Sequence, residues 1–235
     1  MKKIVIILVF LFLSGWQSQV FAEAAEEEKI PDLEVTETES GRKVDLESAK
    51  AHLKRAQDYF QLEALDKAQE EYQQALKANP GSAAAHFGLG YCQEMKNDVR
   101  GAIKEYLAAK RLDSKHFDAS SRLADIYVSM GIFDKAIQEY HSALEIDPRY
   151  SQGLIKIGLV YRKQGMLEEA AEAFRTALVI DPESKIAIYN FAGCQKDRGN
   201  IREACEELDR LKARVKNSET KRLVDKILID LCTAS

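Results

Sequence analysis

The chain has 235 residues, of which 46% are hydrophobic and 31% are charged, a composition typical of a soluble protein with many helices. Its net charge of −4 at pH 7 comes from the N-terminal part, because from Ser48 onward 28 acidic residues face 29 basic ones. A nearly neutral remainder argues against the clustered lysines and arginines that bind nucleic acid, so we expect no nucleic-acid partner.

The first 22 residues are typical of a secretory signal peptide. Lys2 and Lys3 give a positive start, residues 4–13 are an unbroken apolar run, and Val20 and Ala22 offer small side chains at the two positions that a signal peptidase inspects. A run of ten apolar residues is short for a transmembrane helix, which needs about 20. The alternative is an uncleaved anchor in the inner membrane formed by residues 4–22. From the signal peptide we expect an exported protein. The signal is short and the sequence has no Asn-X-Ser/Thr glycosylation acceptor, which is compatible with the periplasm of a bacterium.

Residues 23–47 form the acidic segment, with ten acidic and three basic residues. Such a segment buries too little apolar surface to offset the entropy lost when a chain becomes ordered. We therefore predict a flexible acidic linker. An acidic arm that docks on a basic partner is the alternative.

From residue 49 onward the same residue types return every 34 residues, in windows that span residues 49–82, 83–116, 117–150, 151–184 and 185–216. Position 20 of each window is alanine, position 8 is alanine or glycine, and position 24 is aromatic in all but the last window. A fixed period of this length indicates stacked structural repeats. The residues at position 20 are Ala68, Ala102, Ala136, Ala170 and Ala204, and those at position 8 are Ala56, Gly90, Ala124, Gly158 and Ala192.

Each window predicts two antiparallel helices joined by a tight turn at position 15, where three windows have the glycine that ends a helix at low cost. Pro80, Pro148 and Pro182 stop the second helix, since proline cannot continue its hydrogen bonds. Ser82 and Ser151 stand where N-caps are expected. Positions 8 and 20 face each other across the hairpin, and small side chains there let the helix axes approach to about 8 Å. The aromatic residue at position 24 fills the space beside position 8.

These slots closely resemble those of the tetratricopeptide repeat family, from Ala49 to about Leu211. The resemblance implies an all-α fold, a right-handed α-solenoid of five helical hairpins. His52 and His86 replace a large aromatic residue of the family, and terminal repeats are often atypical in this way. The third and fourth windows carry nearly all of the family's slots: Leu123, Ala124, Tyr127, Ala136, Tyr140, Ala143, Pro148, Ile157, Gly158, Tyr161, Ala170, Phe174, Ala177 and Pro182.

Residues 217–235 follow the last window with an amphipathic pattern of apolar and charged residues. Because every repeat leaves an apolar face for its neighbour, an array needs a terminal element whose outer side is polar. We predict a capping helix here, from Glu219 to about Cys232.

Four cysteines, Cys92, Cys194, Cys205 and Cys232, raise the question of a disulfide. Cys194 and Cys205 fall on opposite sides of one predicted hairpin, beyond the Cα separation of about 4.4–6.8 Å that a disulfide needs. A bond between Cys205 and Cys232 remains open. We favour the interpretation that the cysteines act as small buried hydrophobic residues.

The sequence gives no indication of an enzyme. Its four histidines share no metal-binding spacing, and it contains no glycine-rich phosphate loop, nucleophile elbow or Cys-X-X-Cys pair. We expect a protein without catalytic residues, cofactor, metal or small-molecule substrate, and with no membrane contact other than the N-terminal segment.

The resemblance also implies where a partner binds, because the first helices of successive repeats in this family line a concave groove. Large apolar residues beside lysine and arginine in those slots suit a peptide with acidic residues. Of the slots with which some family members grip a peptide's C-terminal carboxylate, only Arg122 matches, so we do not expect that activity. The groove residues are Lys54, Gln57, Phe60, Phe87, Tyr91, Glu94, Arg122, Asp125, Ile155, Lys156, Leu159, Arg162, Tyr189 and Asn190, with Val128, Lys163 and Lys196 in further slots.

We therefore predict a protein–protein interaction scaffold that binds a peptide or protein partner in this groove. The resemblance makes assembly of a bacterial envelope complex, of secretion or pilus type, the expected setting. The alternatives are a homo-oligomeric structural scaffold, paired through its convex face or terminal helix, and a non-catalytic subunit of an enzyme complex.

Overall fold

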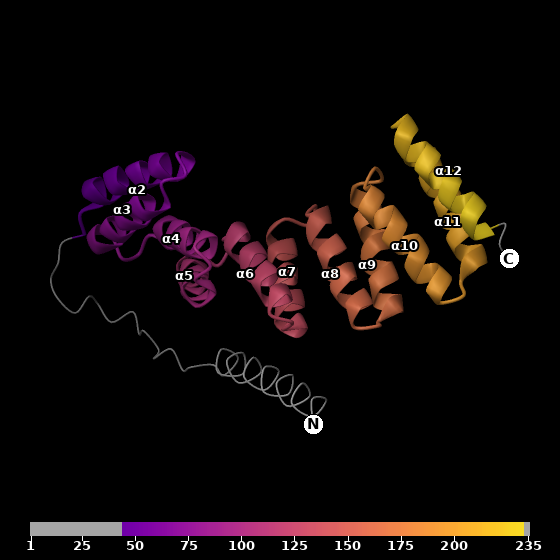
Figure 1. Ribbon diagram of the computed structural model, residues 1–235, viewed down its shortest axis with the longest axis horizontal. Coiled ribbons are helices and arrows are strands. Elements are labelled where there is room, and N and C mark those ends of the chain that lie inside the picture. The colour runs from indigo at the N-terminus through magenta and orange to yellow at the C-terminus, as the bar shows by residue number, and fades with distance from the viewer. Residues whose placement is uncertain (1–43, 233–235) are drawn as a thin grey trace, which may run out of the picture. The chain divides into compact units, whose positions relative to one another are not determined.

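The computed structural model describes residues 44–232, within which every regular element is an α-helix (Figure 1). These residues form five helical hairpins and a capping helix, so the predicted all-α solenoid fold is confirmed. The chain divides into two compact units after Glu105, within α5 (Val99–Leu112). The predicted signal peptide and most of the predicted linker lie outside the described residues.

The first unit contains α2 (Leu46–Gln61), α3 (Leu65–Ala78), α4 (Ala83–Met95) and the start of α5. Helix α2 begins inside the span predicted as linker, because the Asp45 side chain caps it by accepting a hydrogen bond from the Ser48 N–H at 3.0 Å. Ala56 and Ala68 are both fully buried at the hairpin crossing, as the spacing predicts.

The aromatic ring of Tyr72, on α3, packs against the next hairpin. A Cβ added to Gly88 of α4 would lie 2.2 Å from Cζ of that ring, so the tyrosine fills the space that the glycine leaves. The sequence pattern placed the aromatic residue beside position 8 of its own hairpin and did not predict this contact. The Tyr72 side chain is buried, and burial raises the pKa of its hydroxyl to about 12.

The second unit contains the rest of α5 and the hairpins that follow it. Its hairpin crossings are buried like those of the first unit, since Ala124, Ala136 and Ala170 are fully buried. Its further helices are α6 (Phe117–Ser129), α7 (Phe133–Ile146), α8 (Ser151–Lys163), α9 (Leu167–Ile180), α10 (Lys185–Asp197), α11 (Ile201–Arg214) and α12 (Ser218–Cys232).

The turn inside each hairpin has the left-handed backbone that the position-15 pattern predicts. The residues with positive φ are Glu63, Asn97, Gly131, Gly165 and Gly199. Of the predicted N-caps, Ser82 is confirmed, since its side chain accepts from the Ala85 N–H. The prediction for Ser151 is wrong, because α8 begins at Ser151 itself and its N-cap is Tyr150.

Helix α12 closes the end of the second unit. Its Val224, Ile227 and Leu231 are buried in the same hydrophobic cluster as Leu208 and Leu211 of α11. A helix with one such face and an opposite face of Lys221, Arg222 and Lys226 is what a solenoid end requires.

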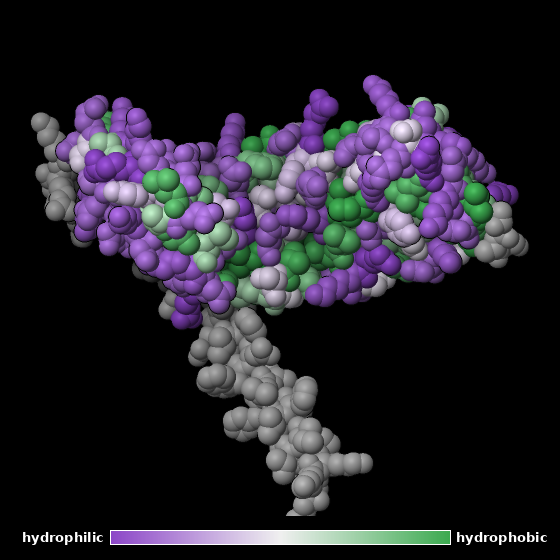
Figure 2. All heavy atoms as spheres, turned by 45° about the horizontal axis from the view of Figure 1, so that its top comes forward, coloured by the Kyte–Doolittle hydropathy of each residue, from purple (hydrophilic) through white to green (hydrophobic). Residues whose placement is uncertain are grey.

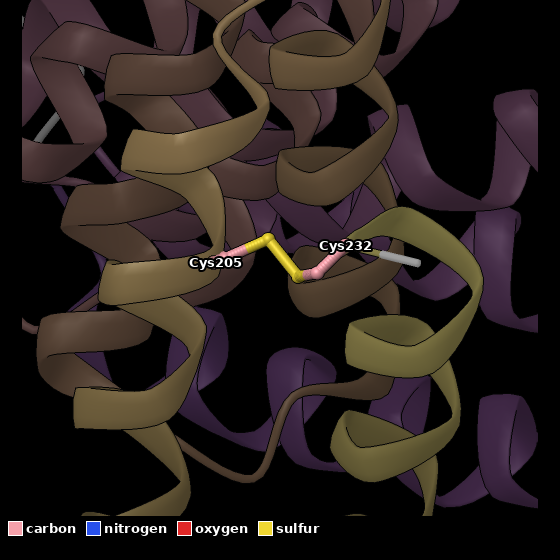
Figure 3. Close-up of a disulfide and its surroundings, with 2 residues drawn as sticks. All are labelled: Cys205 and Cys232. Carbon is pink, nitrogen blue, oxygen red and sulfur yellow. A yellow bond between two sulfur atoms is a disulfide. The ribbon is translucent and has the colours of Figure 1, made fainter. Parts of the chain in front are cut away.

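A disulfide between Cys205 of α11 and Cys232 of α12 fastens this cap, with a Cα separation of 6.4 Å (Figure 3). The prediction that the cysteines are small buried residues is therefore wrong for this pair, although it is confirmed for Cys92 and Cys194, which are free and buried. Burial raises the pKa of the Cys92 thiol to about 11, so little of it is present as reactive thiolate at neutral pH.

Candidate functional site

The groove residues of the first unit gather as an aromatic cluster on α2 and α4. The rings of Phe60 and Tyr91 are 5.0 Å apart between centroids, and those of Phe87 and Tyr91 are 6.3 Å apart and stacked. All three side chains are half-buried. Aromatic pairs at these distances stabilise one another, so the cluster serves the packing of the unit while it keeps part of its surface accessible.

The polar groove residues of the first unit lie around this cluster. Lys54 and Gln57 on α2 are exposed, and Glu94 on α4 is half-buried. Gly88 occupies a groove slot on α4, but the ring of Tyr72 fills the space beside it. In this unit a partner can therefore contact the accessible parts of the aromatic rings, but it finds no cavity at Gly88.

The two histidines that replace aromatic residues of the family make matching contacts. The Nδ1 atom of His52 lies 2.6 Å from Glu71 Oε2, and that of His86 lies 2.6 Å from Glu105 Oε2, 19 residues later in both cases. Burial raises the pKa of Glu71, but hydrogen bonds from His52 and Arg55 outweigh it, and the pKa is lowered overall. Both pairs join the two helices of a hairpin, so these histidines contribute to its packing.

In the second unit, three groove-side residues form one hydrogen-bonded group. The hydroxyl of Tyr140 donates to Asp125 Oδ1 at 2.6 Å, and Lys156 Nζ donates to the two Asp125 oxygens at 2.6 and 2.8 Å. Burial raises the pKa of the Tyr140 hydroxyl, and the Asp125 carboxylate raises it further. Because Lys156 pairs with Asp125, this part of the groove does not repel an acidic ligand.

A small hollow lies beside this group, with a volume of about 240 Å³. Its apolar lining includes Val128 of α6 and Leu159 of α8, of which Leu159 is 42% exposed. The ammonium group of Lys163, also in the lining, lies 5.0 Å from the Phe133 ring centroid. Sites for small-molecule ligands usually measure about 300–1,000 Å³, so this hollow suits one side chain of a peptide better than a whole substrate.

On α10, next to α8, apolar side chains stand at the surface. Tyr189 is 60% exposed and Ile186 is 53% exposed. In Figure 2, hydrophobic residues interrupt an otherwise hydrophilic surface in several such patches. Arg162 of α8 reaches α10, where its Nη1 donates to Asn190 Oδ1 at 2.6 Å. Ile186 was not predicted, although it occupies position 2 of its window, one of the slots that face the groove.

Two further predicted residues differ in burial. Arg122 of α6 is half-buried. Ile155 of α8 is only 2% exposed and belongs to the hydrophobic core, so its assignment to the groove surface is corrected. Ile155 packs in one cluster with buried residues of α9 and α10, and it supports the groove surface from the core.

Residues 44–232 contain no group of three or more histidine, cysteine, aspartate or glutamate side chains placed to hold a metal ion. Within the same residues, no helix combines the length and the apolar character that crossing a membrane requires. The site consists of packed side chains, ion pairs and exposed apolar surface.

Family comparisons match most of the helical part of the chain. Models described as tetratricopeptide repeat match residues 53–117 and 161–227, and one described as TPR repeat matches residues 124–165. No curated protein matches the chain.

Solved structures share the fold. A crystal structure of MamA is 29% identical, covers 57% of this chain and 78% of its own, and has a TM-score of 0.55. YrrB, described as a TPR protein with an unusual peptide-binding site, is 22% identical, covers 76% of this chain and 92% of its own, and has a TM-score of 0.60. PilF of Pseudomonas aeruginosa is 22% identical, covers 80% of this chain and 87% of its own, and has a TM-score of 0.59.

Proposed function

The chain is a tetratricopeptide repeat protein, a member of a family of typically non-catalytic interaction scaffolds, and from that premise we propose that it binds a protein segment on the first helices of its second unit. The observation that carries the proposal is the exposed apolar surface of Leu159, Ile186 and Tyr189 on the adjoining helices α8 and α10. Large apolar side chains at the surface are common anchors for a partner.

The charges around this surface indicate the chemistry of the partner. Lys163 and Lys196 are exposed on α8 and α10, and Lys156 is already paired with Asp125. A peptide with apolar anchors and acidic residues complements this arrangement, because the lysines steer its approach and the apolar side chains hold it. A rigid helical surface lowers the ordering cost of the bound segment, and no chemical step is involved.

We also propose that the protein acts in the bacterial envelope. The sequence of residues 1–22 supports export, and the disulfide between Cys205 and Cys232 independently supports an oxidising compartment, where such bonds persist. We take a pilus or secretion complex as the setting, as the family resemblance implies, and the fold shared with PilF is compatible with it.

Binding on the first helices is tested by photo-crosslinking in living cells. A benzophenone amino acid at position 189 of the full chain should capture a partner, and Leu159→Ala with Lys163→Glu should reduce its yield by about tenfold or more. Leu62→Ala is the matched control, because Leu62 is 74% exposed but lies in the turn after α2. An equal yield in the double variant would show that the partner does not use this surface.

Two further measurements separate the alternatives. Light scattering of the mature protein should give a monomer, and a stable oligomer would favour a homo-oligomeric scaffold instead. Cell fractionation with N-terminal sequencing should recover a soluble periplasmic protein that begins at Glu23. A full-length protein in the membrane fraction would favour the anchor.

A further inference from the structure

A second hollow in the second unit is lined mainly by the second helices α9 and α11 and shares no lining residue with the proposed groove. It has a volume of about 240 Å³ and is lined from α9, α10 and α11. Its floor consists of Leu178, Phe191, Leu208 and Leu211, each no more than 6% exposed. Val179 of α9 is adjacent in sequence to Leu178 and is 62% exposed. The sequence patterns gave no indication of this hollow, because they describe hairpin crossings and first-helix slots.

Arginines surround this apolar floor. Arg175, Arg210 and Arg214 line the hollow together with a single carboxylate, that of Glu207. Arg175 is already engaged, since its Nε donates to Glu207 at 3.0 Å and its guanidinium lies 5.7 Å from the Phe191 ring centroid. The Arg175 side chain therefore forms a fixed side of the hollow.

The other two arginines are held more loosely. Arg210 is 78% exposed and approaches Glu206 only to 3.8 Å. Arg214 is exposed, and its Nη2 donates to the Val179 carbonyl oxygen at 2.9 Å, which positions the guanidinium at the edge of the hollow. A guanidinium has five N–H donors, so a carboxylate can still bind beside that bond.

We propose that this hollow is a second docking site, which takes one apolar side chain of an acidic protein segment while Arg210 and Arg214 pair with carboxylates next to that side chain. The apolar floor favours a protein segment over a free anion, which would leave the floor unused. The volume favours one side chain over a lipid chain or a small substrate. The protein would then hold two partners, one on its first helices and one on its second helices.

A photo-crosslinker at Val179 of the full chain, activated in living cells, tests the proposal. Mapped by mass spectrometry, the adducts should fall in partner segments where acidic residues flank an apolar residue. R210E/R214E should lower the adduct yield by about tenfold or more, because it replaces attraction by repulsion. R222E/K226E makes the same change of charge on exposed residues of α12 outside the hollow and should retain the yield.

Two controls keep this result separate from folding and from the groove. R210E/R214E should have the melting temperature of the wild type. If it does not, R210Q/R214Q, which removes the two charges without reversing them, takes its place. Capture from position 189 should be unchanged by either variant. The proposal is overturned by the absence of adducts, by segments without acidic residues, by capture only of lipid or a second copy of this chain, or by an unchanged yield in both variants.

Discussion

In the first unit, residues 44–105, Tyr91 lies between Phe60 and Phe87 and all three rings are half-buried, whereas in the second unit, residues 106–232, Tyr189 is 60% exposed. Both tyrosines occupy groove slots of their windows. The repeat position fixes the helix face on which a side chain begins, but its neighbours decide whether it is covered. The second unit therefore offers the larger anchor to a partner.

The ends of the units differ as well. Among the described residues, the disulfide and the capping helix belong to the second unit alone, where Cys205 and Cys232 join α11 to α12. Hairpin crossings, by contrast, are alike, with Ala68 and Ala136 both fully buried. The variants below test which of these differences determine stability and which affect binding.

The largest expected effect comes from removing the disulfide. C205S/C232S should lower the free energy of unfolding of the second unit by about 3 kcal/mol, because the bond closes a loop between residues 27 apart and so restricts the unfolded chain. Urea unfolding followed by circular dichroism measures the change. Reductant should destabilise the wild type to the same degree and leave the variant unaffected. If hydrogen exchange showed that the first unit loses as much stability as the second, the disulfide would not stabilise the second unit alone.

Enlarging a crossing residue should affect both units. Ala136→Leu in the second unit and Ala68→Leu in the first should each cost about 1–3 kcal/mol, because neither crossing has room for the added carbons. Thermal melts of the two variants provide the comparison. A melting temperature equal to that of the wild type in either one would show that its helices do not cross at that residue.

Truncating the two tyrosines should separate packing from binding. Tyr91→Ala removes contacts with two rings and should cost about 1–3 kcal/mol, since each aromatic pair contributes about 0.5–1.5 kcal/mol beyond area burial. Tyr189→Ala should leave stability within about 0.5 kcal/mol, as expected for a surface change, and reduce partner capture by a crosslinker placed instead at position 186 of the same helix. Equal destabilisation by both variants would show that Tyr91 and Tyr189 do not differ in their contribution to packing.

A smaller effect should appear with pH at the cap of the second unit. The Glu183 carboxylate accepts hydrogen bonds from the N–H groups of Lys216 and Asn217, at 2.5 and 3.0 Å, and these bonds lower its pKa below the usual 4.5. Its contribution to stability is therefore present above pH 4.5 and is lost as the pH falls through the lowered value.

Glu183→Gln should accordingly reduce stability near pH 7, and its difference from the wild type should shrink as the pH falls below 4.5. Denaturant titrations at several pH values measure this difference. The exposed Glu169 of α9 gives the control, Glu169→Gln. A difference that grows toward low pH would reverse the expected sign and exclude this role for Glu183.

The sequence predicted the fold because its decisive feature is local. A 34-residue spacing of small residues requires close helix crossings, and Ala102 and Ala170 are indeed fully buried. It predicted the exposed Tyr189 but placed the buried Ile155 beside it in the groove, since a slot pattern does not measure depth. The Cys205–Cys232 bond stayed open because it depends on how α12 packs on α11. The arginine-lined hollow on α9 and α11 depends in the same way on contacts between windows.

The contact between Tyr72 and Gly88 links two positions that are 16 residues apart and belong to different repeats. A side chain at residue 88 would require the ring at residue 72 to move, whereas the glycine accommodates it. The second repeat is for this reason not interchangeable with the others. The equivalent position of the other repeats carries a larger side chain, so a repeat exchanged into the second place would need that residue changed to glycine to keep the Tyr72 ring where it is.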